Sequence, residues 1–196
     1  MKDVTRADRL TDAGLAVLAA QGMRGLTHRA VDAEAQVPQG TCSNYFRTRE
    51  ELIAALGRRI FDRLTPDDDH LRDRAAAPPT RDHWVRLMVE LFERAREDPE
   101  LHLALLELRL EATRRPELVE PLTAVVRRAF EADLEFHESA GLPGGAQEIV
   151  LLHLAVGGLI TELLTLPDAL GIEDPAMILG LLVDRLVYPS STSSGA

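Results

Sequence analysis

Hydrophobic residues recur with the period of an α-helix along nearly the whole chain. Between residues 80 and 97 the apolar positions form the single stripe expected of one buried helix face: Trp84, Leu87, Met88, Leu91, Phe92 and Ala95. Strand-like alternation is absent and aromatic residues make up only 4% of the chain, which argues against a β fold. The pattern predicts an all-α protein of about nine helices, at residues 6–21, 27–35, 38–45, 48–64, 80–97, 99–114, 116–140, 145–166 and 174–187.

Charge is unevenly distributed along the chain. The formal net charge is −10, yet residues 1–64 hold ten basic and eight acidic side chains, a net of +2, and the remainder carries −12. Such asymmetry favours two modules with different partners. The Asp- and Pro-rich segment 65–79 is expected to be a linker, and the small polar residues 189–196 a flexible tail.

Two short predicted helices near the N-terminus are joined only by Gln36 and Val37 and are braced by helix 6–21. This arrangement is typical of a helix-turn-helix, whose second helix enters the DNA major groove while the first crosses the backbone. The second helix carries small or hydrogen-bonding side chains, and Asn and Gln can read adenine through two hydrogen bonds. A packed helical hairpin without a role in DNA binding is the alternative that this pattern leaves open.

The N-terminal third also resembles the DNA-binding domain of TetR-family transcriptional regulators, over about residues 6–63. The resemblance rests on Leu26-Thr27-x-Arg29-Ala30-Val31, on Ala35-x-Val37-x-x-Gly40-Thr41 and on Tyr45-Phe46-x-Thr48-Arg49-Glu50-Glu51-Leu52. It implies a DNA-binding regulator that dimerises through its last two helices and binds a small molecule in its C-terminal domain. Two positions depart from the family's usual residues: Ser43 replaces a common tyrosine and Arg49 a common lysine.

Motif and resemblance together predict a DNA-binding surface. Arg29, Arg47 and Arg49 flank the second helix and are expected to contact phosphates. The N-terminus of helix 48–64, capped by Thr48, is expected to offer free N–H groups to a phosphate. The full predicted set is Thr27, His28, Arg29, Pro38, Gln39, Gly40, Thr41, Ser43, Asn44, Tyr45, Arg47, Thr48 and Arg49. The predicted domains are a helix-turn-helix domain at 1–47, a connecting helix at 48–64, the linker at 65–79 and a ligand-binding and dimerisation domain at 80–188.

The last two predicted helices are apolar on more than one face, which indicates a second partner beyond their own domain. A two-fold copy of the chain would meet this need through a four-helix interface, and the predicted interface residues are Leu151, Leu154, Leu159, Leu163, Ile178, Leu182 and Leu186. The alternative is that both helices are central in the core of a monomer. For the effector pocket that the resemblance implies, the candidate lining is Trp84, Met88, Phe92, Leu105, Leu108, Arg109, Phe130 and His153.

Other functions have weaker support. Di-metal carboxylate sites in helical bundles need Glu-x-x-His on two helices, and this spacing does not occur, so we expect no metal, no cofactor and no catalysis. A helical adaptor that binds protein instead of DNA stays open, supported only by Ser43. The charged N-terminus and the single cysteine, Cys42, are expected of a cytoplasmic protein without a signal peptide, and the apolar stretch 149–166 favours a buried helix over a membrane span.

Overall fold

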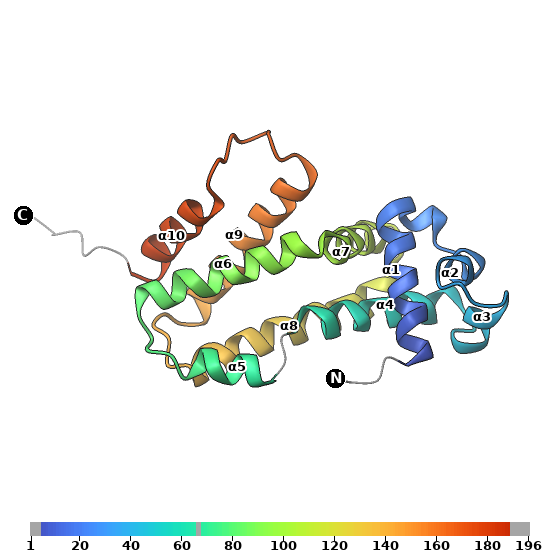
Figure 1. Cartoon of the computed structure of the whole chain (residues 1–196), viewed down its shortest axis with the longest axis horizontal. Helices are drawn as coiled ribbons and strands as arrows, with labels where there is room; N and C mark the ends of the chain where they lie inside the picture. The colour runs from blue at the N-terminus through green and yellow to red at the C-terminus, as the bar shows by residue number, and fades with distance from the viewer. Residues whose placement is uncertain (1–4, 66–67, 189–196) are drawn as a thin grey trace, which may run out of the picture. The chain divides into compact units, whose positions relative to one another are not determined.

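The computed structural model describes residues 5–65 and 68–188, and within them the chain is entirely helical, with no strand (Figure 1). The all-α prediction is confirmed. The helices are α1 (Arg6–Gly25), α2 (His28–Glu34), α3 (Thr41–Tyr45), α4 (Arg49–Leu64), α5 (Asp68–Ala75), α6 (Arg81–Glu97), α7 (Pro99–Ala112), the 3₁₀ turn η1 (Pro116–Leu118), α8 (Val119–Ser139), α9 (Ala146–Thr165) and α10 (Pro175–Leu186).

The sequence markers of helix ends have their expected effect at several sites. The Thr48 hydroxyl accepts a hydrogen bond from the Glu51 N–H at 3.1 Å, and the Glu51 carboxylate accepts one from the Thr48 N–H. These two bonds complete the predicted capping box. Gly22, at φ +64°, ends the regular helix of α1 where the apolar stripe stops. Asp98 precedes Pro99 as predicted, but its side chain makes no cap bond and pairs with Arg63 instead.

Helix α5 lies inside the segment 65–79, where the sequence analysis predicted no helix. This eight-residue helix has no apolar stripe of its own, which is why the periodicity of the sequence missed it. Tertiary contacts hold it in place. The Arg74 Nε donates to a Glu90 carboxylate oxygen at 2.6 Å, and His83 hydrogen-bonds the Arg74 carbonyl at 3.0 Å.

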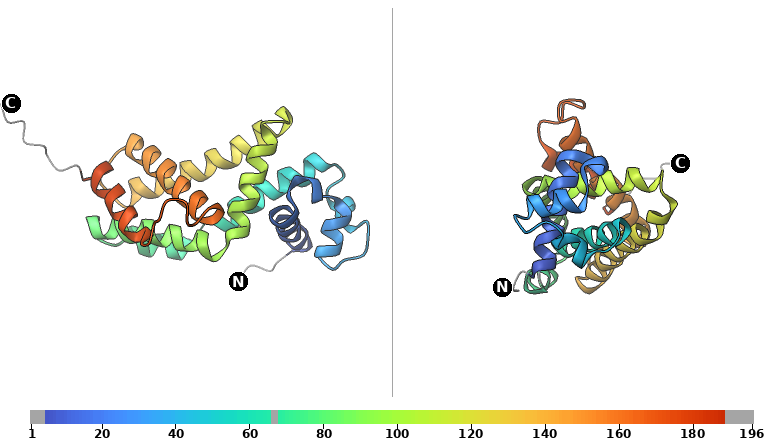
Figure 2. Two further views of the ribbon diagram at one scale, coloured as in Figure 1. Left: turned by 90° about the horizontal axis from the view of Figure 1, so that it is seen from above. Right: turned by 90° about the vertical axis from the view of Figure 1, so that its right-hand side faces the viewer.

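The chain divides into two compact units. The first unit comprises residues 1–66 and 98–129, and the second comprises 67–97 and 130–196 (Figure 2). Helices α1 to α4 of the first unit share one hydrophobic core with α7 and η1, because Leu101 and Leu108 of α7 and Leu118 of η1 are buried beside Leu18 and Leu52. The first unit therefore extends beyond the boundary at residue 64 that the sequence suggested.

The second unit has two cores. Trp84, Leu152 and Val183 lie in one of them, and Phe92, Ile160 and Leu179 lie in the other. The Trp84 indole N–H donates to the Pro143 carbonyl at 3.3 Å, and its ring packs 5.5 Å from that of His137. Helices α6, α9 and α10 are thus joined by apolar side chains from all three helices, and the predicted stripe of residues 84–95 is the contribution of α6.

Candidate nucleic-acid interface

The turn between α2 and α3 is short and tightly bonded. Ala35 ends α2 and Gln36 adopts φ +54°. The Val37 N–H then donates to the Asp32 carbonyl at 3.0 Å. Helix α3 then starts at Gly40, whose φ of +90° lies in the left-handed region that favours glycine. The Gly40 cap has no side chain, so a helix of only five residues begins without a cap of its own.

Asp32 supplies that missing cap from α2. Its carboxylate accepts the Gly40 N–H and the Cys42 N–H, each at 2.7 Å, and the residue is only 3% exposed. A charged acceptor with two short bonds fixes the first turn of α3 against α2. The sequence analysis missed Asp32. The signal in the sequence was a glycine cap on a short helix, which requires an acceptor from elsewhere.

The other end of α3 is held by His28. Its Nε2 lies 2.7 Å from the Phe46 carbonyl, and the Phe46 ring packs partly buried against the core of the first unit. His28, predicted as a DNA contact, is thus half-buried and engaged with the backbone that follows α3. Thr27 caps α2 by accepting the Ala30 N–H at 3.1 Å.

The outer side of α3 and the turn before it present polar groups to solvent. Gln39 of the turn is exposed, and so are Ser43, Asn44 and Tyr45 of the helix, Tyr45 to 49%. The hydroxyls of Thr41 and Ser43 donate to the carbonyls of Pro38 and Gly40, at 2.5 and 3.0 Å. Within the described residues the side-chain amides of Gln39 and Asn44 have no protein partner, so both are available to a ligand in solvent.

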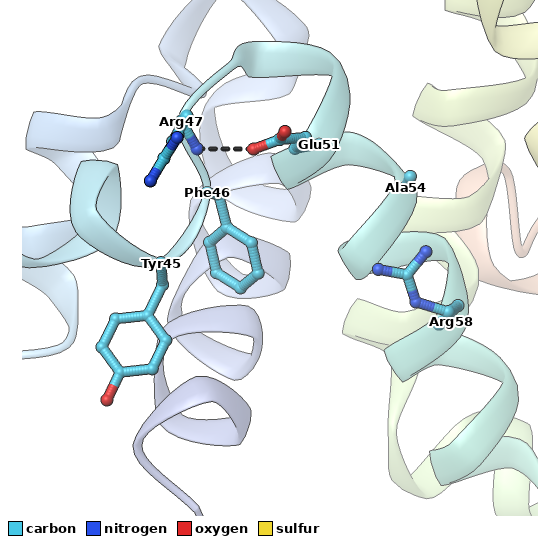
Figure 3. A pocket seen from close by; sticks show the side chains of 6 residues that line it. All are labelled: Tyr45, Phe46, Arg47, Glu51, Ala54 and Arg58. Carbon is cyan, nitrogen blue, oxygen red and sulfur yellow. Dashed lines mark hydrogen bonds between the residues drawn. The ribbon is translucent and has the colours of Figure 1, made fainter.

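Arginines flank this face. Arg29 and Arg47 are exposed as predicted. Figure 3 shows an open hollow of about 500 Å³ beside Arg47, lined by Tyr45, Phe46, Arg47, Glu51, Ala54 and Arg58. The Phe46 ring lies between α3 and α4, and Arg47 and Arg58 stand on opposite sides of the hollow. Arg58 is absent from the predicted set because it lies two turns along α4, beyond the helix-turn-helix pattern.

Arg49 differs from its predicted role as a phosphate contact. Its guanidinium reaches back to the end of α1, where Nη1 donates to the Leu26 carbonyl at 2.9 Å and Nη2 donates to the Met23 carbonyl. The side chain therefore joins α4 to the α1–α2 turn. A planar fork can hold two carbonyls at once, which a lysine ammonium does less well, and this accounts for arginine at a position where lysine is common.

The N-terminus of α4 is also less open than predicted. The Glu51 carboxylate accepts the Arg47 N–H at 2.6 Å as well as the Thr48 N–H. Hydrogen bonds from its own backbone N–H and from the Thr48 side chain lower the pKa of Glu50. Side chains of this segment therefore already bind three N–H groups beside this helix end: the Glu51 carboxylate binds those of Arg47 and Thr48, and the Thr48 hydroxyl binds that of Glu51.

Cys42 lies inside the first unit beneath α3. It is fully buried, and burial together with the neighbouring Asp32 charge raises the pKa of its thiol to about 11. The neutral thiol packs as a small apolar residue.

The predicted ligand-binding residues are not gathered at one place. Leu105 and Leu108 pack in the core of the first unit and Arg109 is exposed, so these three are not walls of a pocket in the second unit. The remaining five, Trp84, Met88, Phe92, Phe130 and His153, lie in the second unit. There the rings of Phe130 and His153 meet edge to face at 5.6 Å, and the His153 Nδ1 lies 3.8 Å from an Asp133 carboxylate oxygen.

The residues predicted to form the dimer interface differ in their exposure to solvent. Leu151 and Leu154 are 48% and 65% exposed, whereas Leu159 is buried and Leu163, Ile178, Leu182 and Leu186 are half-buried in the cores of the second unit. Leu159 thus packs in the chain's own core. Three further apolar residues of these helices are exposed: Val150 on α9 and Met177 and Leu181 on α10. When a helix carries leucines on more than one face, the sequence does not show which face packs against the chain's own core.

Two further properties concern the described residues only. They contain no cluster of three or more His, Cys, Asp or Glu side chains placed to hold a metal ion. By length and composition, α9 alone among their helices passes the test for a membrane span, with a mean hydropathy of 1.6, and 28% of that stretch is buried. One such helix is weak evidence, because core helices of soluble proteins pass the same test.

The sequence matches two family models. Residues 10–56 match the bacterial regulatory proteins of the tetR family, and residues 79–189 match the tetracyclin repressor-like C-terminal domain. The chain belongs to the TetR family and is a DNA-binding transcriptional regulator, which confirms the resemblance found in the N-terminal third. No curated protein sequence matches the chain.

Solved structures of the same fold include ligand-bound proteins. The multidrug binding protein EbrR complexed with imidazole is 24% identical, with a TM-score of 0.69 over 97% of this chain and 99% of that one. EbrR is also known in complexes with ethidium and with proflavin. A TetR-family member from Streptomyces coelicolor A3 is 22% identical, with a TM-score of 0.70 over 93% of this chain and 99% of that one.

Proposed function

We propose that the protein is a homodimeric repressor that reads a near-palindromic operator through α3 and leaves it when a small molecule binds the second unit. The observation that carries the proposal is the exposed surface formed by α3 and the turn before it, where the amides of Asn44 and Gln39 have no partner within the described residues. These two side chains are suited to adenine, and the exposed Arg29 and Arg47 beside them are suited to phosphates.

The exposed apolar face of α9 and α10 supports the homodimer. Leu151, Leu154, Met177 and Leu181 are each about half exposed or more, and a Cβ built at Gly157 or Gly158 on α9 would meet nothing within 4 Å. Glycines on an open apolar face let a second helix approach closely. Two chains that meet here would form a four-helix interface and bury side chains that otherwise contact water.

A dimer of this kind gives a mechanism for release. Its two copies of α3 must lie about 34–36 Å apart to enter successive major grooves. A small molecule that favours a conformation with another spacing lowers operator affinity by its differential binding, and about 1–3 kcal/mol of coupling changes affinity roughly 5- to 150-fold. The effector site is proposed to lie among Trp84, Phe130 and His153.

We expect Gln39→Ala and Asn44→Ala to weaken binding to the operator selectively. Loss of an adenine contact costs roughly 1–3 kcal/mol in each half-site, while binding to unrelated DNA stays unchanged. The measurement is fluorescence anisotropy with the DNA upstream of the protein's own gene, against a scrambled duplex.

Arg47→Ala is the matched control for that measurement. It is expected to weaken binding to both duplexes alike and to reduce the slope of log K against log salt by about one for each phosphate that the variant no longer binds. Equal operator binding by the parent and by both amide variants would refute the assignment of α3 as the reading helix.

A second expected result concerns the effector. Trp84 is the only tryptophan and is 3% exposed, so its emission reports on the interior of the second unit. Proflavin or ethidium added to the DNA-free protein is expected to quench this emission with saturation. Quenching that rises linearly, as for free tryptophan, would contradict a specific site for these dyes.

The same proposal includes a cytoplasmic location and the absence of catalytic activity. Both are supported by membership of a family of DNA-binding regulators. Fractionation of cells and an activity screen of the purified chain test them directly.

A further inference from the structure

A surface groove runs along η1 and the first half of α8. It is a hollow of about 540 Å³ lined by Pro116, Val119, Glu120, Thr123, Ala124 and Arg127, all within the first unit. The four lining residues other than Glu120 and Arg127 are small or apolar, and Val119 is 49% exposed. Its lining includes none of the predicted DNA-binding residues and no residue of α9 or α10.

The spacing of the lining residues explains the shape of the groove. Pro116, Glu120 and Ala124 form one row in steps of four, and Val119, Thr123 and Arg127 form a second row beside it. A groove between two such rows is the feature into which a ridge of another helix packs, most often at a crossing angle near −50°. The occupant that fits is therefore a helix.

We propose that this groove binds the same face of a second copy of the chain, across a two-fold axis between Thr123 and Ala124. The short side chains at the centre let two helices come close. On either side of that centre, Glu120 and Arg127 are equally distant in sequence and opposite in charge. Antiparallel copies thus place each Glu120 opposite Arg127 of the partner subunit.

The charges of the groove support this occupant. Among the described residues neither Glu120 nor Arg127 has a salt-bridge partner within 4.0 Å, so both are available. Exposed ion pairs add little affinity, but opposite charges at matched distances fix the register of a contact and reject others. A two-fold contact is self-complementary, as this pattern requires.

This contact is separate from the one proposed for α9 and α10. Chains already paired through those helices carry two such grooves and would associate further through them, first into assemblies of four. On DNA, such contacts would make neighbouring operator-bound dimers cooperate.

Sedimentation velocity of the full chain over a wide concentration range tests the proposal. The parent is expected to show a reversible doubling of mass as concentration rises. Glu120→Arg or Arg127→Glu places like charges opposite each other and is expected to raise the dissociation constant of that step about tenfold or more. The double variant, Glu120→Arg with Arg127→Glu, is expected to restore it.

Two further variants complete the experiment. Ala124→Trp fills the groove with an exposed side chain and is expected to abolish the doubling without changing the thermal unfolding temperature. Glu135→Arg, an equal charge change at an exposed position of the same helix, is expected to have no effect. A parent that does not double, as when the groove receives a helix of another protein, overturns the proposal, and so does a double variant that stays as weak as either single one.

Discussion

Asp32→Ala is expected to destabilise the first unit by roughly 2–4 kcal/mol and to abolish operator binding. The carboxylate receives two backbone N–H groups at 2.7 Å, from Gly40 and Cys42. Its removal leaves both donors without an acceptor, one of them in a fully buried residue. The first turn of α3 then has no cap, and both the short helix that carries Asn44 and the turn before it that carries Gln39 lose their fixed position.

Urea unfolding followed by circular dichroism, together with operator binding, measures both effects. Asp32→Asn keeps one acceptor oxygen and is expected to lie between the parent and the alanine variant. Glu34→Ala removes an exposed carboxylate from the same helix and serves as the control, with a change within about 0.5 kcal/mol. If Asp32→Ala unfolds at the parent's urea midpoint, Asp32 does not hold α3 in place.

Leu154→Asp is expected to convert the protein to monomers and to lower operator affinity about 10²- to 10⁴-fold. Leu154 is 65% exposed at the middle of the apolar face of α9, so a carboxylate there is harmless to the isolated fold. In the proposed interface the same carboxylate would be buried without a partner, which is strongly unfavourable. A monomer also binds only one half-site at a time.

Light scattering gives the mass of the variant and anisotropy gives its affinity. Leu110→Asp is the matched control, because Leu110 is an exposed leucine of the first unit, 53% exposed, outside the proposed interface. It is expected to leave both values unchanged. Dimers of Leu154→Asp at the parent's dissociation constant would refute the assignment of this face.

The sequence predicted the fold well because its helices are locally encoded. Thr48, Pro99 and Gly22 mark helix ends through short-range geometry, and the spacing of Leu87, Leu91 and Ala95 marks a buried face regardless of what covers it. Helix α5 was not predicted from such local signals. Its position depends on contacts made by Arg74 with α6, and no periodic pattern within eight residues records a contact with a distant segment.

At the candidate site, the exposed face of α3 was predictable and its support was not. Gln39 and Asn44 stand out because polar residues on a helix of this motif have few other roles. Arg49 and Asp32 are charged residues whose surroundings decide their role, and those surroundings come from α1 and from α3. A charge pattern predicted phosphate contact for Arg49, but tertiary contacts direct it to carbonyls.

The first unit is discontinuous, and this constrains how such a protein can be recombined. The chain passes between the two units three times, so no single cut separates them. A chimera that joins residues 1–64 to the C-terminal part of another regulator would exchange Leu101, Leu108 and Leu118 for foreign side chains and leave Leu18 and Leu52 beside mismatched neighbours. Exchange of DNA specificity between relatives is therefore easier by replacing the exposed residues of α3 alone than by transplanting the N-terminal segment.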